Sequence, residues 1–329
     1  MRYFTNSELD TMRRCPRKWY FSQYLSIYRQ REVVNEAMYT GTLAHAAIAE
    51  LYNKGNDPLA EITLMAATDR AENETALIDA NDGARAIIEQ NLERIGASEE
   101  LAIIMVTGYL EWLNEEGPDE FLTFISAEEE LNIVIPSEQI QEIKPVALLG
   151  KLDARFIDER SGARVFMDHK TVQNFPDREK WAHLDPQFLY YGLIEYLTLQ
   201  GEQEVDPDAV PWTDGGIINM LRKVKRSARA KPPFYKRKEV RHSQHELRNF
   251  YIRTVGEVLR ILQIEMQLDS GLDHHLACPP SPTSNCSWDC PYLQLCPMTD
   301  DGSDVSGFIE DAFKVGDPIE RYVSIEDAE

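Results

Sequence analysis

The chain of 329 residues has no apolar run long enough to cross a bilayer, and its first ten residues lack the hydrophobic stretch of a signal peptide. Membrane-spanning and secreted classes are not expected, and we predict a cytoplasmic location. The sequence also lacks an internal repeat. Its length is sufficient to bury a substantial core, either as one large domain or as a core with a helical subdomain.

Basic residues are scarce: 34 lysines and arginines stand against 56 acidic residues, and the formal net charge is −22. Such a charge opposes nucleic-acid binding at long range, so the local distribution of basic residues matters more than the sum. Residues 222–241 carry ten basic residues and one acid, with Phe234 and Tyr235 between them. Basic residues interleaved with aromatics can follow a phosphate backbone and stack on bases. We expect a mobile loop that binds nucleic acid through Lys223, Lys225, Arg226, Arg229, Lys236 and Arg237. The alternative is a solvated loop that only balances the acidic surface.

Cysteines are few but unevenly placed. Cys15 stands alone near the start, whereas Cys286, Cys290 and Cys296 follow one another as C-x3-C-x5-C, with Cys278 shortly before them. Thiolates at such spacing, without a secretory signal, indicate metal or cluster ligation rather than disulfides. One remote and three close thiolates suit either a tetrahedral zinc or a four-iron cluster. Cys278 in place of Cys15 is one alternative, and five free cysteines are another.

Two strands are predicted for residues 146–158 and 163–172, joined by the polar, glycine-containing turn 159–162. Asp168 and Lys170 are two apart and therefore share a face, and Asp153 on the partner strand can reach the same place. Two converging carboxylates are ligands suited to Mg²⁺ or Mn²⁺, and a lysine beside them can position a water that attacks a phosphate. The alternative for these three residues is an ordinary ion-paired hairpin.

Other candidate residues lie in segments of helical pattern. His45 belongs to the helical run 45–52, and Gln187 and Tyr191 are four apart on a helix predicted for residues 186–199, hence on one face. Taken alone, each of these could have a packing role. Three glutamates precede the hairpin on an expected strand; one of them could join a metal shell, but we expect them to be solvated: Glu128, Glu129 and Glu130.

In combination these motifs resemble the PD-(D/E)XK nucleases, in the RecB-like branch. The resemblance rests on four motifs in the family's order: Gly41-Thr42-Leu43-Ala44-His45, Gly150-Lys151-Leu152-Asp153, Asp168-His169-Lys170-Thr171 and Gln187-Phe188-Leu189-Tyr190-Tyr191. It implies that His45, Asp153 and Asp168 bind the metal and that Lys170 is the catalytic lysine. It also implies that Gln187 and Tyr191 flank the catalytic site and contact DNA or the lysine.

A subset of RecB-like nucleases, which includes the AddB-type subunit and the CRISPR-adaptation exonucleases, carries one cysteine before the nuclease core and three after it. In that subset the four thiolates hold a 4Fe-4S cluster that ties the chain ends together. The resemblance implies the same cofactor here, with Cys15, Cys286, Cys290 and Cys296 as ligands and zinc as the alternative. This chain departs from the usual C-x2-C spacing by one extra residue between Cys286 and Cys290.

We therefore expect an α/β fold with a PD-(D/E)XK restriction-endonuclease-like core, a central mixed sheet flanked by helices. Around that core we expect a helical insertion and a C-terminal cysteine cluster module. An amphipathic helix is predicted for residues 7–25, a strand for 215–224 and a long helix for 243–268. The predicted divisions are 1–57 (N-terminal helices), 58–120 (helical insertion), 121–270 (nuclease core), 271–298 (cluster module) and 299–329 (an acidic tail, solvated and partly disordered).

The resulting functional hypothesis is a Mg²⁺- or Mn²⁺-dependent DNA exonuclease of recombination, repair or replication. By analogy with the resembling family it would act from ends and prefer single strands. The sequence has no helicase motif, so unwinding would require a helicase or recombination partner, and an oligomer is possible. One alternative is a catalytically silent module that binds DNA ends or a partner; a zinc-stabilised regulator is a further one.

Overall fold

The computed structural model describes residues 1–30, 33–53, 57–78, 80–135, 137–202, 213–227 and 229–322. The chain divides into two compact units. The terminal unit combines residues 1–32, 130–150 and 248–329, and the central unit combines residues 33–129 and 151–247. In the part of the chain that is described, no helix combines the length and the apolar character needed to cross a membrane.

The sheet of the central unit is arranged around β5 (Ala163–Val172). β4 (Val146–Asp158) pairs with β5 antiparallel, β6 (Thr213–Arg222) pairs with it parallel, and β7 (Tyr235–Val240) is antiparallel to β6. β3 (Leu122–Val134) pairs with β4. Parallel and antiparallel neighbours occur together, so the sheet is mixed. The buried run Val165-Phe166-Met167 suits β5, because an interior strand is covered on both faces.

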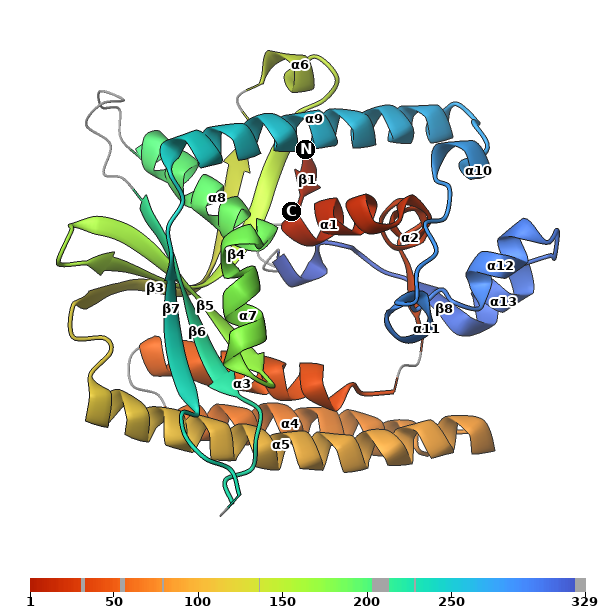
Figure 1. Ribbon diagram of the computed structural model, residues 1–329. Helices are drawn as coiled ribbons and strands as arrows, with labels where there is room; N and C mark the ends of the chain where they lie inside the picture. Colours follow the sequence, from red (N-terminus) through yellow and green to blue (C-terminus); the bar gives the residue numbers. More distant parts are fainter. Residues whose placement is uncertain are drawn as a thin grey trace. The chain divides into compact units, whose positions relative to one another are not determined.

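Helices cover both faces of this sheet (Figure 1). α3 (Glu36–Tyr52) and α5 (Asp82–Glu116) pack on one face, where Ile48, Tyr109 and Leu221 share a buried cluster, and α4 (Pro58–Ala76) packs against α3 through Ile62. The opposite face carries α7 (Phe175–Trp181), the 3-10 helix Ala182–Leu184 and α8 (Pro186–Glu202). There the rings of Phe166 and Phe188 lie 5.2 Å apart. The predicted mixed sheet flanked by helices is thereby confirmed.

The starts of the three long helices follow from the sequence. A side-chain oxygen at each N-cap accepts a hydrogen bond from the first turn, where backbone N–H groups have no partner within the helix. These caps are Asn35 for α3, Asp57 for α4 and Asn81 for α5. Each cap fixes where its helix begins. The start of α3 in turn fixes the position of His45 along that helix.

The terminal unit joins the two ends of the described chain. β1 (Arg2–Phe4) pairs parallel with the first residues of β4, and β2 (Ile27–Arg29) pairs antiparallel with β8 (Phe313–Val315). A small core forms around Phe21, Tyr292 and Phe313. The helices of this unit are α1 (Asn6–Arg14), α2 (Pro16–Trp19), the π-helix Tyr20–Tyr24, α6 (Glu138–Gln141), α10 (His274–Ala277), α11 (Cys286–Asp289), α12 (Leu295–Asp300), α13 (Ser306–Ala312) and the 3-10 helix Glu320–Tyr322. The long helix α9 (Gln244–Asp269) begins in the central unit and continues into the terminal one.

Three predicted elements require correction. The helix expected over residues 7–25 is three short helices, because Cys15 and Pro16 interrupt it. Residues 222–241 are not a mobile loop throughout, since β7 occupies part of this segment. The acidic tail is not solvated up to residue 322: α13 and β8 fold back, and Phe313 enters the core of the terminal unit. Residues 323–329 lie outside the described part.

Candidate functional site

The candidate nuclease site lies at a fork in the central sheet. β4 and β5 are paired from Asp158↔Ala163 to Ala154↔Met167, and beyond that point β5 continues beside β6 alone. Asp153 and Asp168 stand immediately past the last pair. The backbone N–H of His169 donates to Asp153 Oδ2 at 2.7 Å. The side chain of Asp153 therefore satisfies an N–H that lies beyond the last strand pair.

Lys170 completes the predicted strand motif. Its Nζ lies 2.6 Å from Asp168 Oδ1, which places the lysine and the carboxylate on one face, as their spacing of two predicted. Asp168 Oδ2 is buried and has no hydrogen-bond partner among the described groups. A buried carboxylate oxygen without a partner is costly, and a bound cation would satisfy it.

The two carboxyl groups differ in acidity. Burial opposes ionisation of Asp153, but His45 beside it holds the pKa of Asp153 below its usual range. Burial raises the pKa of Asp168, and the charge on Asp153 adds to that rise against the opposing effect of Lys170. A divalent cation between them would stabilise both as carboxylates, because it is the largest local charge in such a site.

His45 reaches the fork from α3. Its Nδ1 lies 3.3 Å from Asp153 Oδ2, and 27% of its side chain remains exposed. His45, Asp153 and Glu128 each offer one ligand atom within 4.8 Å of the others. Two carboxylates and one imidazole suit a divalent cation. Asp168, which lies on β5 and is bonded there to Lys170, adds a third carboxylate nearby.

Glu128 is a ligand candidate that the sequence predicted to be solvated. It lies on β3 and has a φ of +53°, a left-handed conformation that non-glycine residues rarely adopt. Lys151 Nζ lies 2.9 Å from Glu128 Oε2. Strained backbone of this kind concentrates at functional sites. The sequence shows three consecutive glutamates on an expected strand. It does not show which of the three points toward the metal ligands.

Gln187 and Tyr191 are placed together on α8, as their spacing predicted. Gln187 Nε2 donates to Tyr191 Oη at 2.8 Å, and the ring of Tyr191 meets Phe166 edge-on at 5.8 Å. Because Phe166 and Asp168 are two residues apart on β5, Tyr191 lies over the same face of the sheet as the carboxylate.

His169 points to the opposite face and takes part in a buried network. Its Nδ1 lies 2.9 Å from the amide nitrogen of Asn219, so Nδ1 accepts a hydrogen bond. Burial lowers the pKa of His169 to about 3, and the ring is neutral. Arg237 joins the same network: its guanidinium contacts Asn219, and it forms an ion pair with Asp119.

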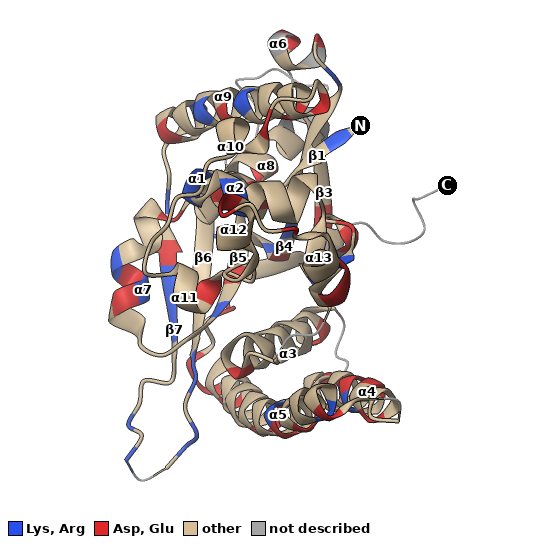
Figure 2. Cartoon of the chain, turned by 90° about the vertical axis from the view of Figure 1, so that its right-hand side faces the viewer, with Lys and Arg blue, Asp and Glu red and all other residues tan. Residues whose placement is uncertain are grey.

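The structure largely buries Arg237, one of the residues that the sequence predicts to contact nucleic acid. Only 12% of its side chain is exposed, and its donors are bound within the protein. Figure 2 colours the basic positions of this segment blue along β6, β7 and the connection between them, and four further predicted contacts are exposed: Lys225, Arg226, Arg229 and Lys236. Three of them form ion pairs with acids: Lys225 with Glu100, Arg226 with Glu111 and Lys236 with Glu179. Arg229 is exposed, whereas burial lowers the pKa of Lys223, whose Nζ lies 3.4 Å from the carbonyl of Ala37.

Four cysteines line one cavity in the terminal unit. The cavity has a volume of about 290 Å³ and is lined by Cys15, Cys286, Cys290 and Cys296, with Arg17 and Lys18 at its wall. The backbone N–H groups of Ser281 and Thr283 point at the sulfurs of Cys15 and Cys286, each at 3.4 Å. Cys278 does not line the cavity. It is buried, and burial raises its thiol pKa to about 11.

The spacing of these sulfurs bears on what they can hold. A single tetrahedral zinc with Zn–S bonds of about 2.3 Å brings its sulfurs to roughly 3.8 Å from one another. Within the described residues, no cysteine belongs to a group of three ligand atoms that lie within 4.8 Å of each other. In the described residues, therefore, no three of these sulfurs are gathered as closely as a single zinc ion would hold them.

Comparison with curated proteins finds no match for this chain. Comparison with protein families gives one result that spans nearly the whole sequence. The model of the PD-(D/E)XK nuclease superfamily matches residues 3–297, a range that includes the fork and all five cysteines. The chain belongs to the PD-(D/E)XK nuclease superfamily.

Proposed function

We propose that this protein is a Mg²⁺- or Mn²⁺-dependent DNA exonuclease that acts from ends and prefers single strands, within recombination, repair or replication. The observation that carries the proposal is the convergence of Asp153, Asp168 and Lys170 at the fork, with His45 beside them. Superfamily membership supports metal-dependent nuclease activity. End preference, strand preference and pathway rest on the resemblance to RecB-like nucleases.

Each group at the fork has a role in this proposal. His45, Asp153 and Asp168 would hold the cation; the first two lie within ligand distance of Glu128, a further carboxylate, and Asp168 follows on the neighbouring strand. A bound cation of this kind polarises a phosphate oxygen and lowers the pKa of a coordinated water. Lys170, fixed by its bond to Asp168, positions the attacking water and stabilises charge that builds on the phosphate. Tyr191 and Gln187 support the geometry from α8.

We further propose that Cys15, Cys286, Cys290 and Cys296 hold a 4Fe-4S cluster. Support comes from the 290 Å³ cavity that they share and from the N–H groups aimed at two of the sulfurs. In this proposal the cluster is structural, because α11 and α12 contribute ligands from the C-terminal segment and Cys15 contributes one from the N-terminal segment. Anaerobically purified protein would then be brown, and a zinc protein would be colourless.

The test of the nuclease proposal is digestion of end-labelled linear single-stranded DNA and of its circular counterpart. Anaerobically purified wild type is compared with Lys170→Ala and with Lys314→Ala, an exposed lysine on β8 in the terminal unit. We expect wild type and Lys314→Ala to degrade the linear strand and spare the circle, and Lys170→Ala to leave both intact. If wild type cuts neither substrate with either metal while the cluster is intact, the DNA-end-binding module is the better hypothesis.

A further inference from the structure

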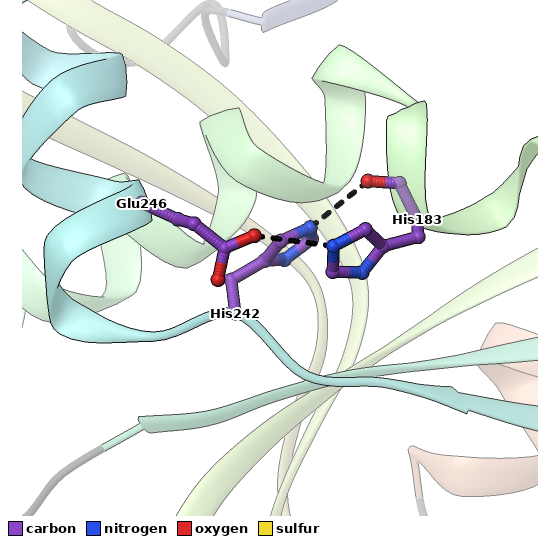
Figure 3. A group of neighbouring side chains, drawn as sticks. All are labelled: His183, His242 and Glu246. Carbon is purple, nitrogen blue, oxygen red and sulfur yellow. Dashed lines mark hydrogen bonds and ion pairs between the residues drawn. The ribbon is translucent and has the colours of Figure 1, made fainter.

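A second group of metal-ligating side chains lies outside the fork, at the start of α9 (Figure 3). His183 comes from the 3-10 helix Ala182–Leu184, His242 from the connection between β7 and α9, and Glu246 from the first turn of α9. Each side chain offers one ligand atom within 4.8 Å of the other two. The two imidazole rings stack with centroids 4.8 Å apart and planes 24° from parallel.

The contacts of the two histidines show which nitrogen of each ring can bind a metal. His242 Nε2 lies 3.2 Å from the carbonyl oxygen of His183, and a carbonyl only accepts, so this nitrogen carries the proton and Nδ1 of His242 is the unprotonated one. His183 Nε2 lies 3.1 Å from Glu246 Oε1, a separation that two ligand atoms of one metal ion also have, so a bound ion takes the place of the proton between them. Histidines that bind metals characteristically donate their other N–H to a carbonyl or a carboxylate, and His242 has this arrangement.

Glu246 is held in place by the helix start. Its Oε2 accepts from the backbone N–H and from the hydroxyl of Ser243, both at 2.8 Å, and its own N–H donates back to that hydroxyl at 3.3 Å. This reciprocal pair is a capping box. The side chain of His183 is 60% exposed and that of Glu246 41%, whereas His242 is buried, so one side of the group is open for an ion to enter.

We propose that His183, His242 and Glu246 bind a zinc-class transition-metal ion. Two imidazoles and one carboxylate are ligands that zinc accepts and that Mg²⁺ does not prefer, and three protein ligands leave a fourth position for water. The ion fastens the 3-10 helix Ala182–Leu184, which directly precedes α8, to the start of α9. This proposal is independent of the proposed nuclease activity.

The test measures how many Zn²⁺ ions the full-length protein binds, by competition with a chromophoric chelator. The thiols and the fork also bind metal, so the comparison is between variants: wild type, His183→Ala, Glu246→Gln and the control His245→Ala. His245 is an exposed histidine on the same helix, one residue before Glu246 and outside the group. We expect His183→Ala and Glu246→Gln to lose one equivalent of Zn²⁺, or to bind it at least about tenfold more weakly, with His245→Ala unchanged.

A second measurement keeps the result separate from the thiol site. Co²⁺ titrated into wild type and into His183→Ala should give a difference spectrum with weak visible bands and without the intense near-ultraviolet band of cobalt–thiolate. Circular dichroism would show that both proteins are folded. Equal stoichiometry and equal affinity for Zn²⁺ in all four proteins would overturn the proposal and leave the group as a helix cap with an added hydrogen bond.

Discussion

At the scale of single residues, the proposed role of Glu128 as a metal ligand depends on its backbone conformation. Its left-handed φ turns one of three consecutive glutamates toward His45 and Asp153. We predict that Glu128→Gln raises the Mg²⁺ concentration needed for half-maximal cleavage by about tenfold or more, because it removes one negative charge from the cation's surroundings. Single-turnover cleavage of labelled single-stranded DNA at a series of Mg²⁺ concentrations measures this.

The matched control for that experiment is Glu130→Gln, two residues further along β3. It removes the same charge from the same strand, but Glu130 does not belong to the group of ligand candidates. An unchanged Mg²⁺ dependence in Glu128→Gln, or an equal change in Glu130→Gln, would contradict the assignment of Glu128 as a ligand.

Arg155 and Glu195 form the most deeply buried ion pair of the central unit among the described residues. Their side chains are 3% and 1% exposed, and two hydrogen bonds of 2.8 and 2.9 Å join them. We predict that Arg155→Met lowers the free energy of unfolding by about 3 kcal/mol, because the carboxylate of Glu195 is left buried with only Arg164 at 3.6 Å. Urea denaturation measures the loss.

The double variant Arg155→Met/Glu195→Leu serves as the control for the pair. The double variant removes the buried carboxylate itself, and the two ions that lose a partner, Glu129 and Arg164, are partly exposed, so it should be more stable than Arg155→Met alone. A double variant that is less stable than the single one would show that packing, rather than the unpaired charge, causes the loss.

Residue types predicted part of the candidate site. Asp153, Asp168 and Lys170 could be grouped from the sequence because two predictable strands and a spacing of two bring them together. The contacts of Arg237 could not be predicted, because its partner Asp119 is distant in the sequence and a basic residue is ordinarily exposed. The orientation of Glu128 depends on one backbone angle that no local pattern reports.

At the scale of elements, the start of α9 allows a prediction about pH. The backbone N–H and hydroxyl of Ser243 hold the pKa of Glu246 below its ordinary value of about 4.3. A carboxyl group with a lowered pKa in the folded state stabilises the fold above the ordinary value, and that contribution disappears as the pH falls through the lowered pKa. With a chelator present, the melting temperature of wild type should exceed that of Glu246→Gln at pH 7, and the difference should disappear as the pH falls through the lowered pKa of Glu246.

The hydroxyl of the same cap can be tested separately. Ser243→Ala should lower the free energy of unfolding by about 1 kcal/mol, the usual cost of losing an N-cap side chain. Ser270→Ala is a suitable comparison, since Ser270 follows the other end of α9 and its hydroxyl bonds only the carbonyl of Gln267. Equal losses in the two variants would mean that the cap contributes nothing specific.

Elements were predictable where hydrophobic alternation and a turn coincide. The strands expected over residues 146–158 and 163–172 coincide with β4 and β5, because a polar turn separates two strongly apolar runs. β7 was missed because the four residues in the middle of its sequence, Tyr-Lys-Arg-Lys-Glu-Val, are all charged. Its strand conformation arises from pairing with β6. Pairing between two segments cannot be predicted from the β-propensity of one segment alone.

At the scale of the whole molecule, the acidic balance and the basic segment together predict the salt dependence of DNA binding. Lys225 and Arg229 are both exposed, and the ion pair of Lys225 with Glu100 lies at the surface. Both side chains can therefore bind phosphate groups of DNA. Each of the variants Lys225→Ala and Arg229→Ala should reduce the slope of log affinity against log salt by about 0.7 for single-stranded DNA. Fluorescence anisotropy at several salt concentrations measures the slope.

The comparison for this experiment is Arg85→Ala, which removes the same charge from α5, outside the basic segment. Because the net charge of the molecule changes equally in all three variants, a loss of slope in Arg85→Ala as well would assign the effect to overall charge.

The division of the chain into units has a consequence for the order in which the protein can assemble during translation. The central unit is complete in sequence once residue 247 has been made, whereas the terminal unit still requires residues 248–329. Cys15 must then wait for Cys286, Cys290 and Cys296, and β2 must wait for β8. On a ribosome paused near residue 280, the segments that form the fork have therefore all been made. Three of the four cysteines that line the cavity have not yet been added.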